Sequence, residues 1–522
     1  MKLSISGLCL STSMASVMAV STAFADTVEI EARDGSIRII GELLEFDGNH
    51  YSIQTALGTL RIASETVICK GDGCPDTTAN FGDFEMAGSR VLTDKLMPRL
   101  LADYAFHRDA SNTLVSNAGT TNVFRLESEF SGAGEIRIAS ADTEAGFEAI
   151  GSGQAAVALA SRSANSNEIE SFEASSLGNL KSIEQENIIA LDALVLVTHP
   201  SNPVHSISEE AAALIFSGQI ANWNALGGPD LPIVLHGRNP GTGTSEMFED
   251  LVLSESGLSV SRSLNTHDTD EAVADAVWLD EGGIGFTSYA ALGNARALDI
   301  EEACGLRTPA TSFTIKSEEY PYSQVLYAYR TSDDFDPSVA DFMEFITSDN
   351  GQDAVKAIGF VDQNITTETV NGHGFRLATA IATSESQRDL NALQNMMQEL
   401  QTAERLSTTF RFNTGSSRLN ARAEADTQRL ASYLEETNMT GKEVVFVGFT
   451  DSVGKSELNE FLSQNRAELV MQSVLDASPS LASKVNVRAV GFGEIAPVGC
   501  NESNRGRTIN RRVEVWVRDV PA

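Results

Sequence analysis

The spacing of hydrophobic and polar positions changes along the chain, and each period indicates a different type of element. Apolar and polar side chains alternate over residues 26–76, beginning with Val28 and Ile30, which predicts a small antiparallel β module. Residues 78–366 mix short β-like runs, such as Ile188 to Val197, with helical stretches. This mixture predicts an α/β architecture that is large enough for two lobes.

The helical period dominates the next segment, residues 367–405. Four apolar residues recur there at helical spacing between Gln, Glu and Asn: Leu390, Leu393, Met397 and Leu400. They predict a short amphipathic helix, which either docks on a neighbouring domain or forms a coiled-coil seam; so few turns favour docking. In residues 406–522 an apolar run from Val444 to Val447 predicts a buried strand before a helix. The fold class is therefore multidomain, with a small β module, a two-lobed α/β domain and a C-terminal α+β domain.

The N-terminal sequence from Met1 to Ala25 is typical of a secretory signal and ends in the small-x-small sequence Ala23-Phe24-Ala25. Cleavage is expected before Asp26. No later stretch offers eighteen consecutive apolar residues, so no membrane span is predicted. The expected location is the periplasm.

The 522-residue chain carries 37 basic and 72 acidic side chains, a formal net charge of −35. The acids are spread along the chain. This balance disfavours nucleic acid, whose phosphates need a basic surface. A small anion is not excluded, because local N–H groups and one or two arginines can bind it within an acidic protein.

Four cysteines remain after the expected cleavage. Cys69 and Cys74 flank a short Gly-rich loop, which predicts a disulfide in an oxidising compartment. Cys304 and Cys500 can be free or can pair between domains, and the sequence leaves this open. No matching cysteine or histidine pair lies near enough in sequence to suggest a metal site.

Several separated motifs lie in the C-terminal domain. They are Gly448-Phe449-Thr450-Asp451, Asn459-x-x-Leu462-Ser463-x-x-Arg466-Ala467, Gly491-Phe492-Gly493-Glu494 and Asn510-Arg511-Arg512-Val513-Glu514. Asp451 follows the apolar strand and Arg466 lies on the helix after it, so their charges can meet at one strand-helix junction. An ordinary surface ion pair is the alternative for two such residues taken alone.

Taken together, these motifs resemble the OmpA-like peptidoglycan-binding domain over roughly residues 406–518. The resemblance implies that Asp451 and Arg466 hold the amine and carboxylate of diaminopimelate in the cell-wall peptide. Asn459 and Ser463 lie on nearly the same helical face and could donate to or orient the site. Phe449 departs from the family pattern, which usually has His before the Thr-Asp pair, and we expect it to line the site.

Four turns rich in Gly, Ser and Thr precede helical stretches of the central domain. They are Gly88-Ser89-Arg90, Ser140-Ala141-Asp142-Thr143, Ser161-Arg162-Ser163 and Gly241-Thr242-Gly243-Thr244-Ser245. Small residues let the backbone approach an oxyanion, and hydroxyls and helix-start N–H groups can donate to it. A Ser or Thr before a single helix is more often only an N-cap.

The joint occurrence of these turns resembles the PstS-like phosphate-binding proteins of ABC importers, over about residues 84–361. Further resemblance lies in Leu191 to Pro203, in Ile215 to Trp223 and in Gly282 to Phe286. The resemblance implies phosphate contacts from Ser89, Arg90, Ser161, Arg162, Thr242, Gly243 and Thr244. It also makes an ABC importer a candidate partner.

Asp142 has no clear counterpart in that family. A carboxylate could accept a hydrogen bond from protonated phosphate and repel sulfate, but an exposed turn Asp is an equal alternative. Three positions depart from the pattern, namely Val91, Ser245 and Gln324, of which the last two stand where Arg is expected. Arg238 could supply the missing charge.

No catalytic set is apparent. A Gly-x-Ser-x-Gly elbow is absent from the strand-turn-helix junctions, and the histidines show no metal spacing. We therefore expect an exported, non-enzymatic protein without a cofactor. Its central domain would bind phosphate or a similar oxyanion and its C-terminal domain would bind peptidoglycan, which makes the outer membrane a candidate location. The alternative makes the central domain a degenerate spacer or partner-binding module.

Overall fold

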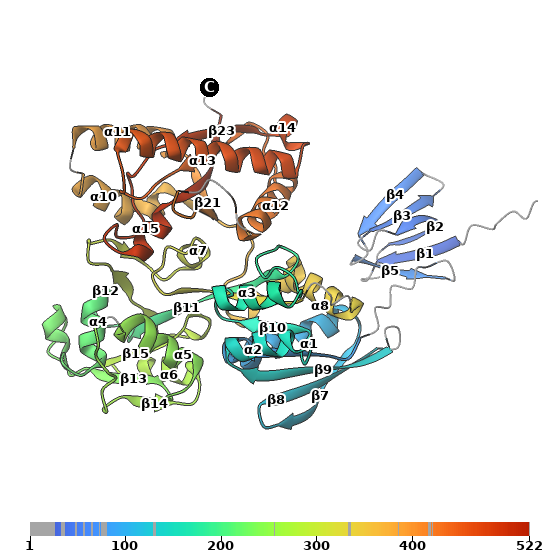
Figure 1. Cartoon of the computed structure of the whole chain (residues 1–522), viewed down its shortest axis with the longest axis horizontal. Helices are drawn as coiled ribbons and strands as arrows, with labels where there is room; N and C mark the ends of the chain where they lie inside the picture. Colours follow the sequence, from blue (N-terminus) through green and yellow to red (C-terminus); the bar gives the residue numbers. More distant parts are fainter. Residues whose placement is uncertain are drawn as a thin grey trace, which may run out of the picture. The chain divides into compact units, whose positions relative to one another are not determined.

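The computed structural model describes residues 27–32, 37–46, 50–55, 58–63, 66–71, 74, 81–128, 132–254, 256–331, 336–384, 386–415, 419 and 421–520. The expected signal sequence lies outside these residues. The chain divides into two compact units, residues 1–79 and residues 80–522 (Figure 1). No helix in the described part is long and apolar enough to cross a membrane.

The first unit is an antiparallel sheet with the strand order β4-β3-β2-β1-β5. Its strands are β1 (Thr27–Ala32), β2 (Arg38–Phe46), β3 (His50–Thr55), β4 (Gly58–Ala63) and β5 (Val67–Lys70). One face buries Val28, Ile30, Tyr51, Ile53 and Val67, in agreement with the alternation in the sequence. A disulfide links Cys69, within β5, to Cys74, which follows the strand, as predicted.

The second unit begins with the central domain, whose main sheet has the order β14-β13-β15-β11-β19-β10-β6-β9-β8-β7. The strands of the first lobe are β6 (Phe84–Ser89), β7 (Ser111–Ala118), β8 (Thr121–Ser128), β9 (Gly132–Ala141) and β10 (Val157–Ala160). Its helices are η2 (Leu92–Leu96), α1 (Met97–His107), α2 (Thr143–Gly151), α3 (Ser166–Ala174), α8 (Pro337–Thr347) and α9 (Asp349–Ile358).

The second lobe has its own core around Trp223, Phe248 and Phe286. Its strands are β12 (Ser206–Ser208), β13 (Val234–Arg238), β14 (Asn265–His267), β15 (Gly283–Ser288), β16 (Arg296–Ala297), β17 (Asp299–Glu301) and β18 (Arg307–Thr308). Its helices are α4 (Glu209–Phe216), η3 (Trp223–Leu226), α5 (Gly243–Phe248), η4 (Glu249–Leu253), α6 (Asp270–Trp278), η5 (Tyr289–Ala291) and α7 (Ser312–Lys316).

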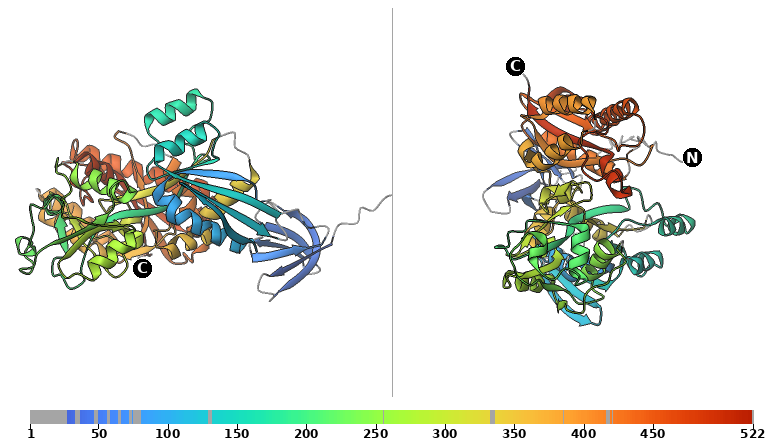
Figure 2. Two further views of the ribbon diagram at one scale, coloured as in Figure 1. Left: turned by 90° about the horizontal axis from the view of Figure 1, so that it is seen from below. Right: turned by 90° about the vertical axis from the view of Figure 1, so that its left-hand side faces the viewer.

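Two long strands join the lobes: β11 (Glu186–Thr198) and its antiparallel neighbour β19 (Ser323–Tyr329). Ile189 and Ala190 of β11 belong to the core of the first lobe, whereas Leu191 and the run from Ala193 to Val197 belong to that of the second. Figures 1 and 2 show the blue-to-cyan lobe and the green lobe as separate halves joined by this sheet. The observed architecture is the two-lobed α/β fold that the sequence predicts.

The C-terminal domain is built on a second sheet, of order β20-β21-β24-β22-β23. Its strands are β20 (Thr367–Thr369), β21 (Glu404–Arg411), β22 (Lys442–Gly448), β23 (Asn486–Gly491) and β24 (Arg512–Asp519). Its helices are η6 (Val370–His373), α10 (Gly374–Ala382), α11 (Gln387–Leu400), α12 (Ala421–Glu436), α13 (Ser456–Ala477), α14 (Leu481–Lys484) and α15 (Asn504–Asn510).

Helices cover both faces of this sheet, which explains the unbroken apolar run of β22. Val444 and Phe446 face the core formed with α12 and α13, whereas Val445 and Val447 face the core formed with α10 and α11. The helix predicted around Leu393 is α11. It docks on the C-terminal sheet and does not project as a free spacer.

The second lobe and the C-terminal domain are joined covalently and by buried charges. Cys304 and Cys500, whose pairing the sequence leaves open, form a disulfide with a Cα–Cα distance of 5.7 Å. Beside this disulfide, the amide of Cys500 donates to the Glu302 carboxylate at 3.1 Å. The cross-link closes a loop of nearly two hundred residues, so it restricts the unfolded chain strongly.

A buried ion network lies at the same junction. Glu319, from the turn after α7, accepts from Arg405 Nη2 at 2.6 Å, while Glu514 accepts from Arg512 Nε at 2.7 Å and Arg376 Nη1 at 2.9 Å. All five side chains are nearly inaccessible to solvent. Burial alone would raise the pKa of both carboxyls, but the arginines outweigh it and hold each pKa below its ordinary range.

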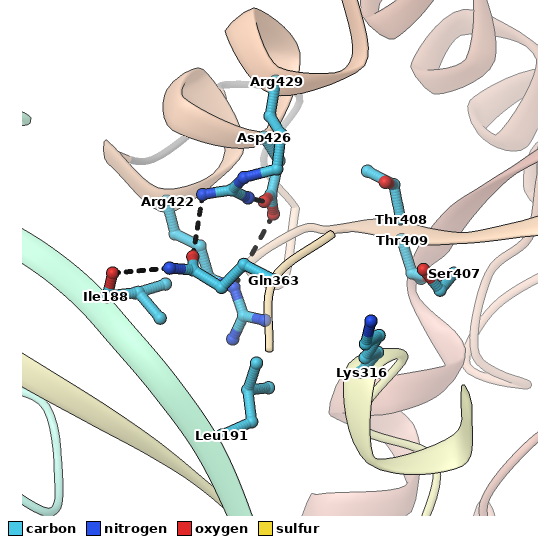
Figure 3. Close-up of a pocket in the computed structure, with 10 residues that line it drawn as sticks. All are labelled: Ile188, Leu191, Lys316, Gln363, Ser407, Thr408, Thr409, Arg422, Asp426 and Arg429. Carbon is cyan, nitrogen blue, oxygen red and sulfur yellow. Dashed lines mark hydrogen bonds and ion pairs between the residues drawn. The ribbon is translucent and has the colours of Figure 1, made fainter. Parts of the chain in front are cut away.

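A small polar cavity of about 30 Å³ also lies between these two domains (Figure 3). It is lined by Ile188, Leu191, Lys316, Gln363, Ser407, Thr408, Thr409, Arg422, Asp426 and Arg429. Its cations have partners: Lys316 Nζ donates to Asp362 at 2.8 Å and Arg429 Nη2 to Gln363 at 2.7 Å. The volume is about that of one water molecule, so the cavity is too small for an organic ligand.

Candidate functional site

The loop after β22 positions Asp451. Thr450 donates its amide to the Gly493 carbonyl at 2.8 Å, and the Asp451 Oδ1 atom accepts from the amide of Val453 at 3.1 Å. Gly448, at the end of β22, allows α13 to approach, because a Cβ atom there would lie 2.0 Å from the Ser463 carbonyl oxygen. The sequence therefore brings the strand end and the helix into direct contact.

Three polar residues share the face of α13 that packs on this junction: Asn459, Ser463 and Arg466, all of them buried. Asn459 Nδ2 donates to the Asp451 carbonyl at 3.3 Å, and Ser463 Oγ accepts from the Gly493 amide at 2.9 Å. These two side chains hold the loops that form the site. The Arg466 guanidinium stacks over the Phe412 ring at 5.0 Å from its centroid.

The residue paired with Asp451 is Arg511, at 2.7 Å between Nη1 and Oδ2. Arg511 belongs to a motif quoted above but was not among the predicted site residues. Burial lowers the pKa of Arg466 to about 10, Arg511 adds to the shift and Asp451 opposes it, so Arg466 stays protonated at neutral pH. We call Asp451, Arg466 and Arg511 the charged site; it carries a net charge of +1.

Phe449, which departs from the expected His, is completely buried. Its ring packs in the core formed with α10 and α11, and the Arg512 guanidinium lies over it at 4.0 Å from the centroid. Phe449 thus supports the loop from the core side and connects it with the buried ion network.

Three of the four turns lie at the ends of adjacent strands of the first lobe. β6 pairs in parallel with both β9 and β10, and Gly88 lies opposite Ser140 on one side and Leu159 on the other. Ser89 is the last residue of β6, and Asp142 and Ser161 directly follow β9 and β10. All three therefore lie at the carboxyl ends of adjacent parallel strands, where ligands of such sheets bind. Ser161 is tied to α2, because its amide donates to Thr143 Oγ1 at 3.1 Å.

The fourth turn comes from the other lobe and faces the first. A Cβ atom on Gly243 would lie 3.2 Å from Val91 Cγ2, so the start of α5 closely approaches the turn after β6. Thr242 caps α5 by accepting from the Ser245 amide at 3.4 Å. Thr244 Oγ1 donates to Asp270 at 3.2 Å. The lobes also meet through Lys95 and Glu271, at 2.5 Å.

Charged residues at the four turns are largely engaged with other protein groups. Arg162 makes two hydrogen bonds to Glu168, at 2.8 and 2.9 Å, and Arg238 Nε lies 3.5 Å from Asp270. Asp142 is an exposed N-cap of α2 that accepts from the Ala145 amide at 2.8 Å. Arg90 is exposed.

Asp270 was not among the predicted site residues. Its contacts with Thr244 and Arg238 form only because α6 begins close to the start of α5. Burial raises the pKa of Asp270, an effect that Arg238 and the Thr244 hydroxyl oppose. Gln324, which stands where an Arg was expected, donates to the Ser161 carbonyl at 2.9 Å and so fixes the third turn.

Comparison with known proteins follows the division seen in the structure. The profile of the PBP superfamily domain matches residues 111–350, and that of the OmpA family matches residues 411–511. The chain carries a PstS-like PBP superfamily domain and a C-terminal OmpA family domain.

Relatives resemble one part or the other. The phosphate-binding protein PstS of Borreliella burgdorferi is 31% identical over 190 residues, which cover 34% of this chain and 65% of that protein. Outer membrane porin F of Pseudomonas aeruginosa is 35% identical over 113 residues, covering 22% and 31%. The chain thus spans less than two thirds of the length of either relative.

Solved structures also resemble the separate domains. An ABC-type phosphate transport receptor from Vibrio cholerae covers 53% of this chain and 99% of its own, with 21% identity and a TM-score of 0.39. The peptidoglycan-associated lipoprotein of Burkholderia pseudomallei covers 21% of this chain and 89% of its own, with 26% identity and a TM-score of 0.19.

The two domain families are those of binding and structural proteins rather than of enzymes. Within the described residues, the group of His, Cys, Asp and Glu atoms close enough for a metal comprises Cys304, Cys500 and Glu502. Both of these cysteines are committed to the disulfide.

Proposed function

We propose that this is an exported envelope protein that grips peptidoglycan through its OmpA domain and captures a small oxyanion, phosphate or a close analogue, through its PBP domain. The observation that carries the first part is the buried charged site. It offers a carboxylate and guanidinium groups within one junction, as the ammonium and carboxylate on the side-chain carbon of diaminopimelate require. Asp451 and Arg466 are the proposed contacts, and Asn459 and Ser463 orient them.

Binding to isolated cell-wall sacculi tests this part. The full chain should co-sediment with sacculi, and Arg466→Ala should remain largely in the supernatant while its thermal unfolding shows a folded protein. Equal pelleting of Arg466→Ala and the parent would contradict the proposed contact.

The proposed oxyanion site is formed by the four turns. The hydroxyl and amide groups of Ser89, Ser161, Thr242, Gly243 and Thr244 are its donors, with Arg90, Arg162 and Arg238 nearby and Asp142 as a candidate acceptor. Support comes from the parallel strand ends and from the close approach of Gly243 to Val91 across the lobes. Closure of two lobes around an ion is a common binding movement.

A second candidate for the PBP domain is a spacer or partner-binding module without an anion. The pairing of Arg162 with Glu168 and of Arg238 with Asp270 favours it, because these acids neutralise the arginines that would attract an anion. Calorimetry on the anion-stripped full chain separates the two candidates. Heat and thermal stabilisation with millimolar phosphate, but less with sulfate, support the oxyanion site; no response to phosphate, sulfate, arsenate or molybdate supports the spacer.

The relatives support an envelope location, and we propose that the mature chain is periplasmic and associated with peptidoglycan. An ABC importer is a candidate partner only if the oxyanion site is functional. Mass spectrometry of the mature protein tests export: it should begin at Asp26 and contain no free thiol at Cys69 or Cys74.

A further inference from the structure

Besides β11 and β19, a third segment crosses between the lobes of the PBP domain. Phe360 packs in the core of the first lobe, and the next residue, Val361, packs in that of the second. Val361 and Leu191 of β11 bind each other through two backbone hydrogen bonds, at 2.8 and 2.9 Å. A rotation of one lobe against the other changes the backbone angles of such crossing segments. We call residues 188–191 and 360–363 the hinge.

Gln363 fastens the third segment to the first-lobe side of β11. Its Nε2 atom donates to the Ile188 carbonyl at 2.7 Å, and its backbone amide donates to Oε1 of Gln352, on α9 of the first lobe, at 2.7 Å. Gln352 is buried and also donates to the Ile189 carbonyl at 3.1 Å. The two glutamines therefore bind consecutive carbonyls at the β-bulge between Ile188 and Ala190.

The residues on either side of Gln363 are held from the second lobe. Lys316 of α7 donates through Nζ to the Asp362 carboxylate at 2.8 Å and to the Asn364 carbonyl at 2.6 Å. Gln363 is thus bound to the first lobe while both of its neighbours are bound to the second. A rotation between the lobes has to act on the hydrogen bonds of this residue.

The OmpA domain reaches Gln363 from the second lobe, to which the interdomain disulfide joins it. Arg422 of α12 pairs with Glu318, which follows α7. Two turns further along α12, Arg429 Nη2 donates to Gln363 Oε1 at 2.7 Å, and Gln363 passes the contact on to Ile188 (Figure 3). Asp426 accepts from Arg429 Nη1 at 2.5 Å and so orients its guanidinium.

We propose that Arg429 is a restraint through which the OmpA domain limits the rotation of the first lobe against the second. Because the OmpA domain is cross-linked to the second lobe, α12 keeps its place on that body when the first lobe turns. A rotation that moves Ile188 away from α12 must break either the Gln363–Ile188 bond or the Arg429–Gln363 bond. The wall-binding domain therefore controls the flexibility of the PBP domain, whether or not that domain binds an anion.

Inter-lobe distances in the ligand-free full chain test this restraint. Spin labels carried by unnatural amino acids at Glu148 of α2 and Asp275 of α6, both exposed, leave the disulfides intact. Arg429→Ala should broaden the distribution of distances measured by pulsed electron paramagnetic resonance. Hydrogen exchange of the Leu191 and Val361 amides should become about three- to tenfold faster, a modest effect because the Arg429 side chain is 32% exposed.

A second variant breaks the same connection at its other bond. Gln363→Glu keeps an acceptor for Arg429 but loses the N–H that donates to Ile188. It should broaden the distances and speed up exchange as Arg429→Ala does. Combining the two changes should add little to either one, because both interrupt one series of bonds.

Arg388→Ala is the matched control. It removes an arginine that bridges α11 to Glu457 and Glu460 of α13, within the OmpA domain, and α11 lies on the other face of the sheet from α12. Its distances and exchange should equal those of the parent. Parent-like behaviour of folded Arg429→Ala, or equal broadening in Arg388→Ala, would overturn the inference; if Arg429→Ala does not fold, Gln363→Glu decides by the same measurements. Failure of the parent to bind sacculi or phosphate would refute the proposed function and leave this inference standing.

Discussion

The charged site of the OmpA domain and the four turns of the PBP domain both contain arginines, but the two regions use them differently. In the charged site Arg511 pairs with Asp451, and the buried Arg466 guanidinium lies over the Phe412 ring at the same junction. At the turns Arg162 and Arg238 each have an acid of their own. The presence of an arginine in a motif therefore does not establish an anion site; its local charge balance does.

The largest expected effect concerns arginines that are buried for structural reasons. Glu319→Gln removes the carboxylate that pairs with Arg405 between the PBP and OmpA domains. The change leaves a buried guanidinium with less compensation, and we expect about 3–5 kcal/mol lower stability in denaturant unfolding. Glu301→Gln, at an exposed position of β17, should change stability by less than about 0.5 kcal/mol. Similar stabilities of the two variants would mean that burial does not magnify charge effects at this junction.

Residue pairs such as Glu319 and Arg405 cannot be predicted from local sequence patterns. The apolar run of β22, Asp451 and the helix with Arg466 lie within a short stretch, so their junction follows from strand and helix periodicity. Glu319 and Arg405, or Cys304 and Cys500, meet only because two separate folds dock. Arg511 was missed for the same reason: it reaches Asp451 from sixty residues further along the chain, after the β23 crossover. Local pattern predicts elements, whereas charge balance requires the packed structure.

The second prediction concerns the pH dependence of the strand that joins the lobes. Burial raises the pKa of Asp192 in β11 from its ordinary 3.8 to about 6, although Ser288 and Ala290 donate hydrogen bonds to it. The folded state thus binds the proton more tightly than the unfolded state. The contribution to stability is complete below pH 3.8 and is lost as the pH rises through 6, by about 3 kcal/mol in total.

Asp192→Asn removes this titration. Denaturant unfolding of parent and variant at several values between pH 4 and 7 should show the parent losing about 2 kcal/mol relative to the variant over this range. Parallel curves would contradict the raised pKa. Such a result would also mean that a buried charge at Asp192 does not destabilise the PBP domain.

The third prediction tests the charged site directly. Asp451→Ala removes the acceptor for a ligand ammonium and leaves two guanidinium groups together. Because a charge-assisted hydrogen bond contributes about 1.5 to 3 kcal/mol, affinity for a soluble wall tripeptide should fall by about one to two decades. Asp476→Ala, on the distal part of α13, is the control and should bind as the parent does. Unchanged affinity in folded Asp451→Ala would rule out the zwitterion contact.

The smallest expected effect comes from a substitution that removes an acid beside one of the four turns, so that an arginine there is no longer neutralised. Glu168→Gln frees Arg162 from its acid but keeps the helix cap, since Gln at this position can still accept from the Asn165 amide. The pair is partly solvent-exposed, so the gain is limited to roughly 1 kcal/mol or less, and phosphate affinity measured by calorimetry should rise a few-fold. Glu173→Gln removes the same charge from the exposed end of α3 and should have little effect. If both variants bind phosphate as weakly as the parent, Arg162 does not face the anion. If neither variant nor the parent binds phosphate, pairing of the arginines with acids does not explain the lack of binding. That outcome favours the interpretation of the PBP domain as a spacer.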